Sequence, residues 1–304
     1  MYKLRDIKRL VTMLKMTQHE LKLHILSQVS KYYNMESIDF SDGFLYCKGN
    51  IPVMLVSHLD TVSATPPQNI VYNKNFITAI ESVLGGDDRC GVFTILNILK
   101  AGFRPHILFT EDEEIGGVGA TKFIAKYPNK IDLKYILELD RRGSKDCVLY
   151  DTGNMDFLQY VESFGFEENW GTFSDISVIS PKYDIASANL SIGYYNEHTR
   201  NEYINNTAMF NTFTKVCNML KDIDNCIYFD MQEIVYTYYN STPNQSRNLI
   251  LYKGKLVTYE EYYKRLYSKN LETYDVEEKE ETNDLNEADK SSESVDNIID
   301  NLPF

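Results

Sequence analysis

The chain has 304 residues, of which 43% are hydrophobic and 25% charged, a composition typical of a soluble globular protein with a substantial core. No apolar run reaches the 18 residues that a membrane helix needs, and no stripe of basic and aromatic residues indicates nucleic-acid binding. The formal charge is −13, but residues 272–304 alone carry −10, which leaves −3 for the rest of the chain.

The cysteines and the N-terminus indicate a cellular compartment. The five cysteines show no CxxC spacing, and the N-terminus has no signal-peptide pattern. Reduced thiols are typical of the cytosol. We therefore expect a cytoplasmic protein that binds neither membranes nor nucleic acids.

Helices and strands alternate along most of the chain. Residues 4–33 predict two helices, and Thr17-x-x-Glu20 is a capping box that opens the second. The predicted strands lie at 44–48, 52–57, 105–110, 135–139 and 189–194, and further helices at 91–101, 118–127 and 207–222. This alternation predicts an α/β fold with a mostly parallel central sheet.

The pattern divides the chain into three parts. Residues 1–223 predict the main domain. Residues 224–271 begin with a poorly patterned connection, followed by a hairpin at 248–258 and a helix opened by Thr258-x-x-Glu261. The tyrosine-rich face of that helix is expected to dock on the main domain. Residues 272–304 predict a disordered acidic tail, which could bind a protein partner.

His58 follows an apolar strand, at the edge of an open α/β sheet where sites form. Asp60, two residues later, can accept the second imidazole N–H and fix the tautomer. The alternative is a strand-end histidine that simply hydrogen-bonds to a neighbouring aspartate.

Two adjacent aspartates follow a pair of glycines and open a helix. For Asp88, capping of the helix and a favourable interaction with the helix dipole are an alternative to metal binding. For Asp87, the preceding glycines allow the close backbone approach that a ligand shared by two metal ions requires.

Four consecutive acids at residues 111–114 follow a buried strand. They would repel one another strongly unless cations were present, so a metal site is favoured over a solvated loop. One carboxylate would bind metal, and its neighbour would act as a general base.

Two more strand ends contribute candidates. Glu138 and Asp140 end one strand on the same face, so either could bind metal; Asp140 is favoured because it lies at the turn. His198 follows the strand at 189–194. His106 is expected at the opposite sheet edge, and His19 and His24 in surface or packing roles.

Together these segments predict a hydrolase with a dinuclear metal centre. Two imidazoles and three carboxylates suit two Zn²⁺ ions, and Co²⁺ or Mn²⁺ would also be accommodated.

In the order of these motifs, residues 1–222 resemble the co-catalytic dizinc aminopeptidase and deacylase superfamily. The stretches Gly-Gly-Asp-Asp-Arg-Cys-Gly and Phe-Thr-Glu-Asp-Glu-Glu-Ile-Gly are most similar to those of peptidase T-like members. The resemblance implies a zinc-exopeptidase (phosphorylase/hydrolase-like) fold, a three-layer α/β sandwich.

The resemblance also implies roles for individual residues. Asp87 would bridge the two metals. His58 and either Glu114 or Asp140 would complete the ligand sets of separate metals, and His198 would be the last ligand. Glu113 would be the general base and Asp60 the partner of His58. The peptide bond after Asp87 is expected to be cis.

The chain departs from peptidase T in one respect. Those proteins insert a lid or dimerisation domain between the last acidic ligand and the final histidine, whereas only 57 residues separate Asp140 from His198 here. We therefore expect a compact architecture without a lid. Ser174, Asp175 and Arg200 could line the substrate pocket or serve only to maintain the fold.

The predicted reaction is metal-assisted amide hydrolysis, with an aminopeptidase acting on small peptides as the first candidate. An N-acyl amino acid deacylase or a carboxypeptidase could use the same site. A non-catalytic scaffold that binds a partner through its C-terminal extension is the remaining alternative.

Overall fold

The computed structural model describes residues 2–150, 152–225, 229–230, 236–238, 247–252 and 255–258. The chain forms two compact units, Met1–Ile234 and Val235–Phe304. None of the helices in the described residues is both long and apolar enough to cross a membrane.

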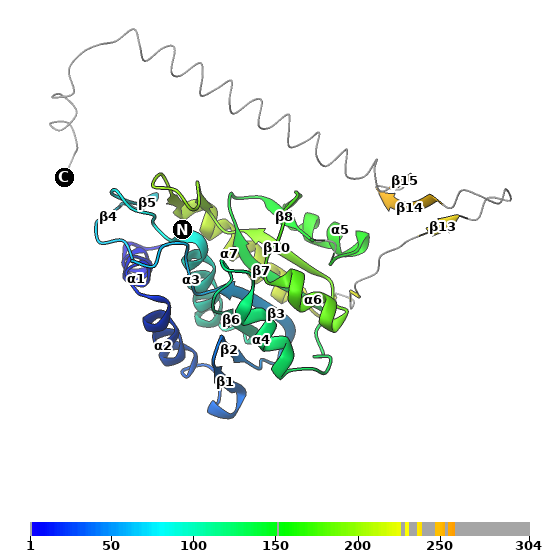
Figure 1. Cartoon of the computed structure of the whole chain (residues 1–304), viewed down its shortest axis with the longest axis horizontal. Helices are drawn as coiled ribbons and strands as arrows, with labels where there is room; N and C mark the ends of the chain where they lie inside the picture. The colour runs from blue at the N-terminus through cyan, green and yellow to red at the C-terminus, as the bar shows by residue number, and fades with distance from the viewer. Residues whose placement is uncertain are drawn as a thin grey trace, which may run out of the picture. The chain divides into compact units, whose positions relative to one another are not determined.

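An eight-stranded sheet forms the frame of the first unit (Figure 1). Its strand order is β1-β2-β6-β3-β7-β10-β8-β9. The four central strands β6, β3, β7 and β10 run parallel, as the alternating pattern predicts. The strands are β1 (Ile38–Ser41), β2 (Phe44–Cys47), β3 (Ile51–His58), β6 (Pro105–Thr110), β7 (Tyr135–Arg141), β8 (Asp146–Val148), β9 (Glu167–Glu168) and β10 (Ser187–Ser191).

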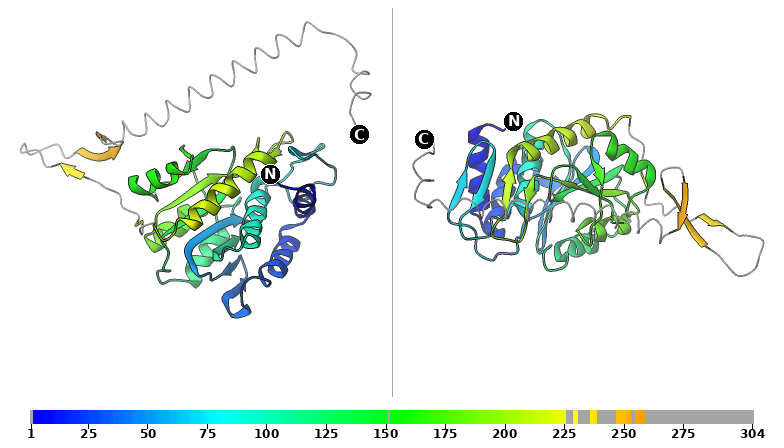
Figure 2. Two further views of the ribbon diagram at one scale, coloured as in Figure 1. Left: turned by 180° about the vertical axis from the view of Figure 1, so that it is seen from behind. Right: turned by 90° about the horizontal axis from the view of Figure 1, so that it is seen from above.

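Helices cover both faces of this sheet (Figures 1 and 2). They are α1 (Leu4–Leu14), α2 (Gln18–Val29), α3 (Gly86–Lys100), α4 (Val118–Lys126), α5 (Met155–Ser163), α6 (Ile176–Tyr183) and α7 (Asn206–Lys221), with a short 3-10 turn η1 at Met35–Ser37. The predicted three-layer α/β sandwich is therefore confirmed.

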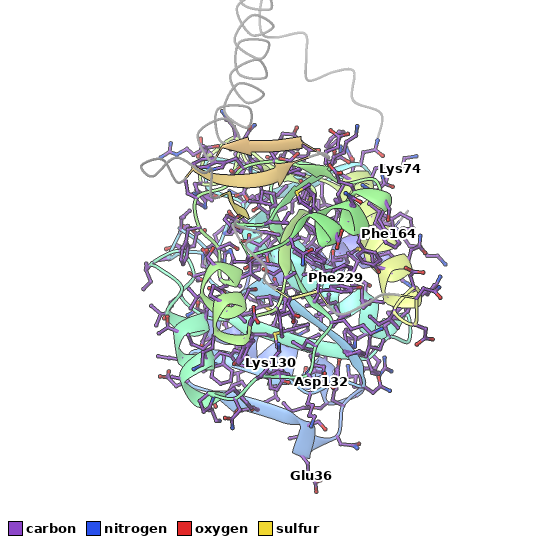
Figure 3. All side chains as sticks on the ribbon, turned by 90° about the vertical axis from the view of Figure 1, so that its right-hand side faces the viewer. Glu36, Lys74, Lys130, Asp132, Phe164 and Phe229 are labelled. Carbon is purple, nitrogen blue, oxygen red and sulfur yellow. The ribbon has the colours of Figure 1, made fainter. Side chains whose placement is uncertain are left out.

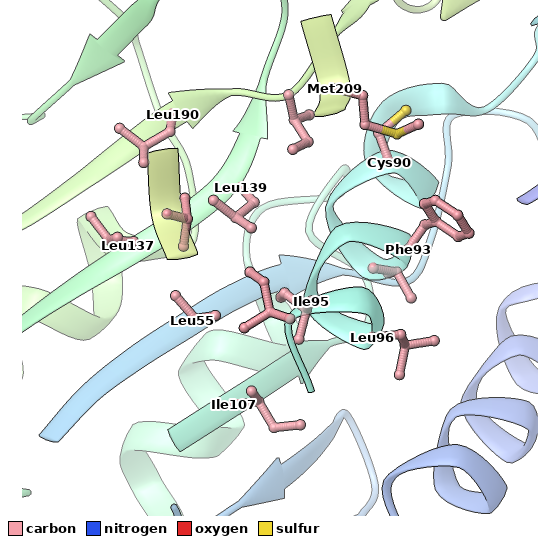
Figure 4. Close-up of a cluster of buried hydrophobic side chains, with 14 of the residues drawn as sticks. Leu55, Cys90, Phe93, Ile95, Leu96, Ile107, Leu137, Leu139, Leu190 and Met209 are labelled. Carbon is pink, nitrogen blue, oxygen red and sulfur yellow. The ribbon is translucent and has the colours of Figure 1, made fainter. Parts of the chain in front are cut away.

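Alternation along β3 sends side chains into two separate cores. Val53 and Leu55 join the core beneath α1, α3, α5 and α7. Met54 and Val56 join the core beneath α4 and α6. Figure 4 shows α3 lying over the first face, with Ile95 above the strand residues Leu55 and Ile107. Because both faces are covered, the polar ends of the central strands are the positions left for chemistry.

A second, four-stranded sheet in the order β11-β12-β5-β4 lies within the same unit. Its strands are β4 (Ile70–Tyr72), β5 (Phe76–Ala79), β11 (Tyr194–Tyr195) and β12 (Tyr203–Asn205). The single strand predicted at 189–194 is thus divided between two sheets. Gly193, with a φ of +93°, is the turning point, and a Cβ there would meet the backbone of Met209.

Residues 141–197 contain β8, α5, β9, α6, β10 and β11, which belong to the two sheets and the helix layers just described. No lid domain stands between Asp140 and His198 in this region, where all residues but 151 are described. The expectation of a compact architecture without a lid is confirmed.

The second unit contains a three-stranded antiparallel sheet of β13 (Tyr236–Tyr238), β14 (Arg247–Tyr252) and β15 (Lys255–Thr258). The predicted hairpin corresponds to β14 and β15, whereas β13 lies in the stretch that showed little pattern. The predicted helix after Thr258 and the acidic tail lie outside the described residues.

Candidate metal centre

His58, the last residue of β3, is 1% exposed and lies among carboxylates. Its Nδ1 is 3.1 Å from Oδ1 of Asp60. Its Nε2 is 3.0 Å from Oδ1 of Asp87 and 3.4 Å from Oδ1 of Asp140. Burial alone would lower the pKa of His58, but the carboxylates of Asp140, Asp60 and Asp87 outweigh burial and raise it. The same carboxylates favour any cation placed at Nε2.

The carboxylate of Asp87 lies between the two candidate histidines. Its Oδ1 faces His58, and its Oδ2 is 3.1 Å from Nε2 of His198. Glu202 positions this loop by accepting hydrogen bonds from the backbone N–H of Gly85 at 2.7 Å and of Asp87 at 3.1 Å. The Asp87–Asp88 peptide bond is cis, as the sequence resemblance implies.

Asp88 has a different environment from its neighbour. Its Oδ1 accepts a hydrogen bond from the backbone N–H of Gly91 at 2.8 Å, and its Oδ2 accepts one from the Ser57 hydroxyl. The backbone angles of Asp87 and Asp88 are non-helical, so the first of these contacts caps the regular helix that follows them. The capping interpretation of Asp88 is therefore consistent with its contacts.

The four acids at 111–114 have different surroundings. The Lys22 ammonium forms an ion pair with Glu111, and Gln18 donates to Asp112 at 3.0 Å. Glu114 Oε1 is 2.9 Å from Nε2 of His198, and Glu113 lines the adjacent cleft. A protein cation thus neutralises the first acid, and only the last two face the centre.

Glu138 and Asp140 take separate positions although both belong to β7. Glu138 is fully buried and accepts a hydrogen bond from the Ser174 hydroxyl. Asp140 lies beside His58 and accepts a hydrogen bond from the Tyr194 hydroxyl at 3.2 Å. The geometry places Asp140, the favoured candidate, at the centre.

The predicted ligands form two triads that share Asp87. One triad is His58, Asp87 and Asp140, and the other is Asp87, Glu114 and His198; within each, the candidate ligand atoms lie within 4.8 Å of one another. His58, Glu113 and Glu114 form a further group within the same limit.

These residues fit divalent cations. When His58 gives its Nδ1–H to Asp60, Nε2 presents a lone pair to the oxygens of Asp87 and Asp140. Lone pairs that face one another in a buried site repel, and a cation among them removes the repulsion. Imidazole and carboxylate donors with a carboxylate behind the imidazole are the set that zinc prefers.

An open cleft of about 410 Å³ gives access to the centre. It is lined by Glu113 and by four residues of the two triads, Asp87, Glu114, Asp140 and His198. Burial raises the pKa of Glu113 to about 7, with further contributions from neighbouring carboxylates. A carboxyl group with such a pKa can exchange protons near neutral pH.

The sequence left open whether Ser174, Asp175 and Arg200 line the substrate pocket or only maintain the fold. Ser174 and Asp175 are buried and hydrogen-bonded to Glu138 and Thr110 respectively, so their contacts maintain the fold. Arg200 is exposed, and the residues that line the cleft do not include it.

Several residues near the centre show no local sequence signal. Tyr194 contacts Asp140, Glu202 holds the Asp87 loop, and Arg142 pairs with Glu197 at 3.0 Å on the cleft wall. Each acts across 54 residues or more, so neither spacing nor periodicity identifies them.

The remaining histidines lie away from the centre. His106 is the second residue of β6, at the opposite edge of the sheet as expected, and its ring contacts Tyr46. His19 is exposed and His24 half-buried on α2, in keeping with surface and packing roles.

No family model matches the chain, and no curated protein matches its sequence. Solved structures do match its fold. Aminopeptidase PepT from Bacillus cereus is 15% identical with a TM-score of 0.56, over 72% of this chain and 98% of that one. A tripeptidase from Staphylococcus aureus is 14% identical with a TM-score of 0.57, over 73% of this chain and 98% of that one.

An aminopeptidase from the archaeon Desulfurococcus kamchatkensis also matches, at 12% identity and a TM-score of 0.55, over 73% of this chain and 97% of that one. At these identities the comparison concerns the fold. The chain has the fold of these aminopeptidases, in agreement with the resemblance seen in its motifs.

Proposed function

We propose that this protein is a dinuclear zinc-dependent hydrolase that cleaves peptide bonds, and that it acts as an aminopeptidase on small peptides. One observation carries the proposal. The two oxygens of the Asp87 carboxylate face two different imidazoles, those of His58 and His198. A carboxylate with this arrangement is suited to bridge two cations.

The two triads supply the ligands. His58, Asp87 and Asp140 would hold one ion, and Asp87, Glu114 and His198 would hold the other. Ions at these positions would polarise a scissile carbonyl and acidify a water molecule. The donor atoms are all nitrogen or oxygen, so Co²⁺ or Mn²⁺ can replace Zn²⁺.

Glu113 is the general base and then the general acid. Its carboxylate takes a proton from the attacking water and passes it to the nitrogen of the leaving amine. Its place on the cleft wall and a pKa raised to about 7 by burial support this role. Asp60 is a positioning residue, because it orients the His58 ring and the backbone that carries Glu113.

Metal quantification combined with hydrolysis assays tests this function. The full chain, purified without chelators, is expected to contain about two ions per chain. It should release an amino acid from unblocked dipeptides, tripeptides and aminoacyl anilides. Asp87→Ala is the control, since it removes the shared ligand from both triads and should lose both metal and activity.

The substrate panel separates the related activities. N-acetylated peptides and acyl-amino acids complete the panel, since a deacylase or a carboxypeptidase would prefer them to unblocked peptides. Less than one ion per chain together with no hydrolysis of any substrate would contradict the proposal.

A further inference from the structure

A second cavity of about 600 Å³ lies at the opposite edge of the main sheet from the metal centre. It is lined by the start of β3, by the start of β6 and by residues 127–132. Figure 3 shows Glu36, Lys130 and Asp132 on the face that carries it. His106 is the second residue of β6 and Thr110 the last, so about 13 Å of strand separates them.

A buried histidine with one unused nitrogen forms the inner wall of this cavity. His106 is 6% exposed, and its Nδ1 lies 2.6 Å from the Tyr46 hydroxyl. With this hydroxyl as the donor to Nδ1, the ring proton lies on Nε2. No group in the described part of the chain pairs with Nε2, which leaves an N–H donor for a ligand in the cavity.

Charges of opposite sign flank this donor. Burial and then the Lys48 ammonium lower the pKa of His106 to about 4, while Asp132 acts in the other direction. Both side chains line the same cavity as the ring. Lys48 and Asp132 are exposed, and neither has an ionic partner among the described residues. Asp39, by contrast, forms an ion pair with Lys126 and accepts a hydrogen bond from the Tyr127 hydroxyl at 2.8 Å.

Part of the remaining wall is apolar, and it lies beside polar and charged residues that include Glu36, Asn129 and Lys130. Ile38, Pro52 and Ile131 are half-buried and line the cavity together with the Tyr127 ring. A ligand suited to His106, Lys48, Asp132 and the apolar part of the wall needs a hydrogen-bond acceptor with negative charge, a positive group close to it and an apolar side chain.

We propose that this cavity binds a zwitterionic α-amino acid with an apolar side chain. The carboxylate accepts the Nε2–H of His106 and pairs with Lys48, and the ammonium pairs with Asp132. Charge-assisted hydrogen bonds of this kind are about twice as strong as neutral ones. The site uses no residue of the metal centre, so it is independent of the proposed hydrolase function.

Calorimetric titration of the full chain tests the proposal with L-leucine as the probe. Leucinamide lacks the carboxylate and 4-methylpentanoate lacks the ammonium. Both analogues are expected to bind at least about tenfold more weakly than leucine, because each loses one charge-assisted contact. Equal binding of either analogue would reduce the site to a simple anion or cation site and overturn the proposal.

Two variants locate the binding. Lys48→Met and Asp132→Asn change exposed side chains and should each weaken leucine binding about tenfold. Lys8→Met, an exposed change on α1, is the matched control and should leave binding unchanged. If leucine binds only at the metal centre, the first two variants will keep full affinity, and the proposal fails. Absence of any leucine binding at millimolar concentrations would also overturn it.

Discussion

The Asp60 carboxylate accepts a hydrogen bond from the backbone N–H of Glu113, with an N···Oδ1 distance of 3.0 Å. The same carboxylate accepts the N–H of Glu114 at 3.0 Å and lies 3.1 Å from Nδ1 of His58. One side chain therefore sets the positions of the proposed base and of ligands from both triads.

Asp60→Asn should weaken metal binding about 10- to 100-fold, the usual cost of losing a carboxylate behind a metal-binding histidine. The amide retains the shape of the side chain but has a single oxygen for three donors. Metal content after dialysis against graded chelator concentrations, together with kcat, measures the effect. Unchanged metal affinity would show that Asp60 does not orient the His58 ring for metal binding.

Glu113→Gln should lower kcat by about 10² to 10⁴ while bound metal stays nearly constant. The amide cannot take a proton, although its size is that of the native side chain. Metal analysis of the same samples decides the role of the residue. Loss of metal along with turnover would make Glu113 a ligand, as its grouping with His58 and Glu114 allows.

Lys22→Met should destabilise the fold by about 3 kcal/mol, because it leaves the Glu111 carboxylate without its cation. Lys22 is 4% exposed, and its ammonium also donates to the Ser41 carbonyl at 2.6 Å. The free energy of unfolding by urea is the measurement. The double variant Lys22→Met, Glu111→Gln should recover part of the loss; equal losses in the single and double variants would refute the pairing.

Folding stability should fall between about pH 6.5 and pH 4 because of His106. Burial lowers the pKa of the folded group to about 4, whereas an unfolded histidine titrates near 6.5. The unfolded chain therefore binds a proton first as the pH falls, and up to about 3 kcal/mol is lost across this window. Below about pH 4 both states are protonated and the loss levels off.

Unfolding curves of the native chain and of His106→Gln, recorded across this window, check the assignment. The variant has no titrating ring, so its stability should fall less steeply from pH 6.5 to pH 4. If the stability of the native chain and of the variant fell equally with pH, the pH dependence would belong to other groups.

Two of the strands that carry the centre could be predicted because each has a short, mostly apolar run followed within two residues by histidine or acids. Val53–Val56 before His58 is one such run, and residues 106–109 before the four acids are another. The cap at Thr17 is likewise local, and both of its hydrogen bonds are present. Signals of this kind depend on a few neighbouring residues.

Other features could not be predicted because they depend on pairs far apart in sequence. The repulsion among the four acids indicated a metal, yet Lys22, 89 residues before Glu111, supplies part of the positive charge. The turn position favoured Asp140 over Glu138, but the Ser174 hydroxyl that binds Glu138 lies 36 residues away. The hairpin of β4 and β5 also escaped prediction, since its burial depends on pairing with β12.

The candidate ligands are dispersed from His58 to His198, and each follows a different segment of the fold. Glu202 also links these parts of the chain, because its carboxylate accepts a hydrogen bond from the Asp87 backbone and lies four residues after His198. A nascent chain lacks a complete pair of triads until the strand before His198 has joined the sheet. Uptake of the second of the two proposed ions would therefore report the completion of folding.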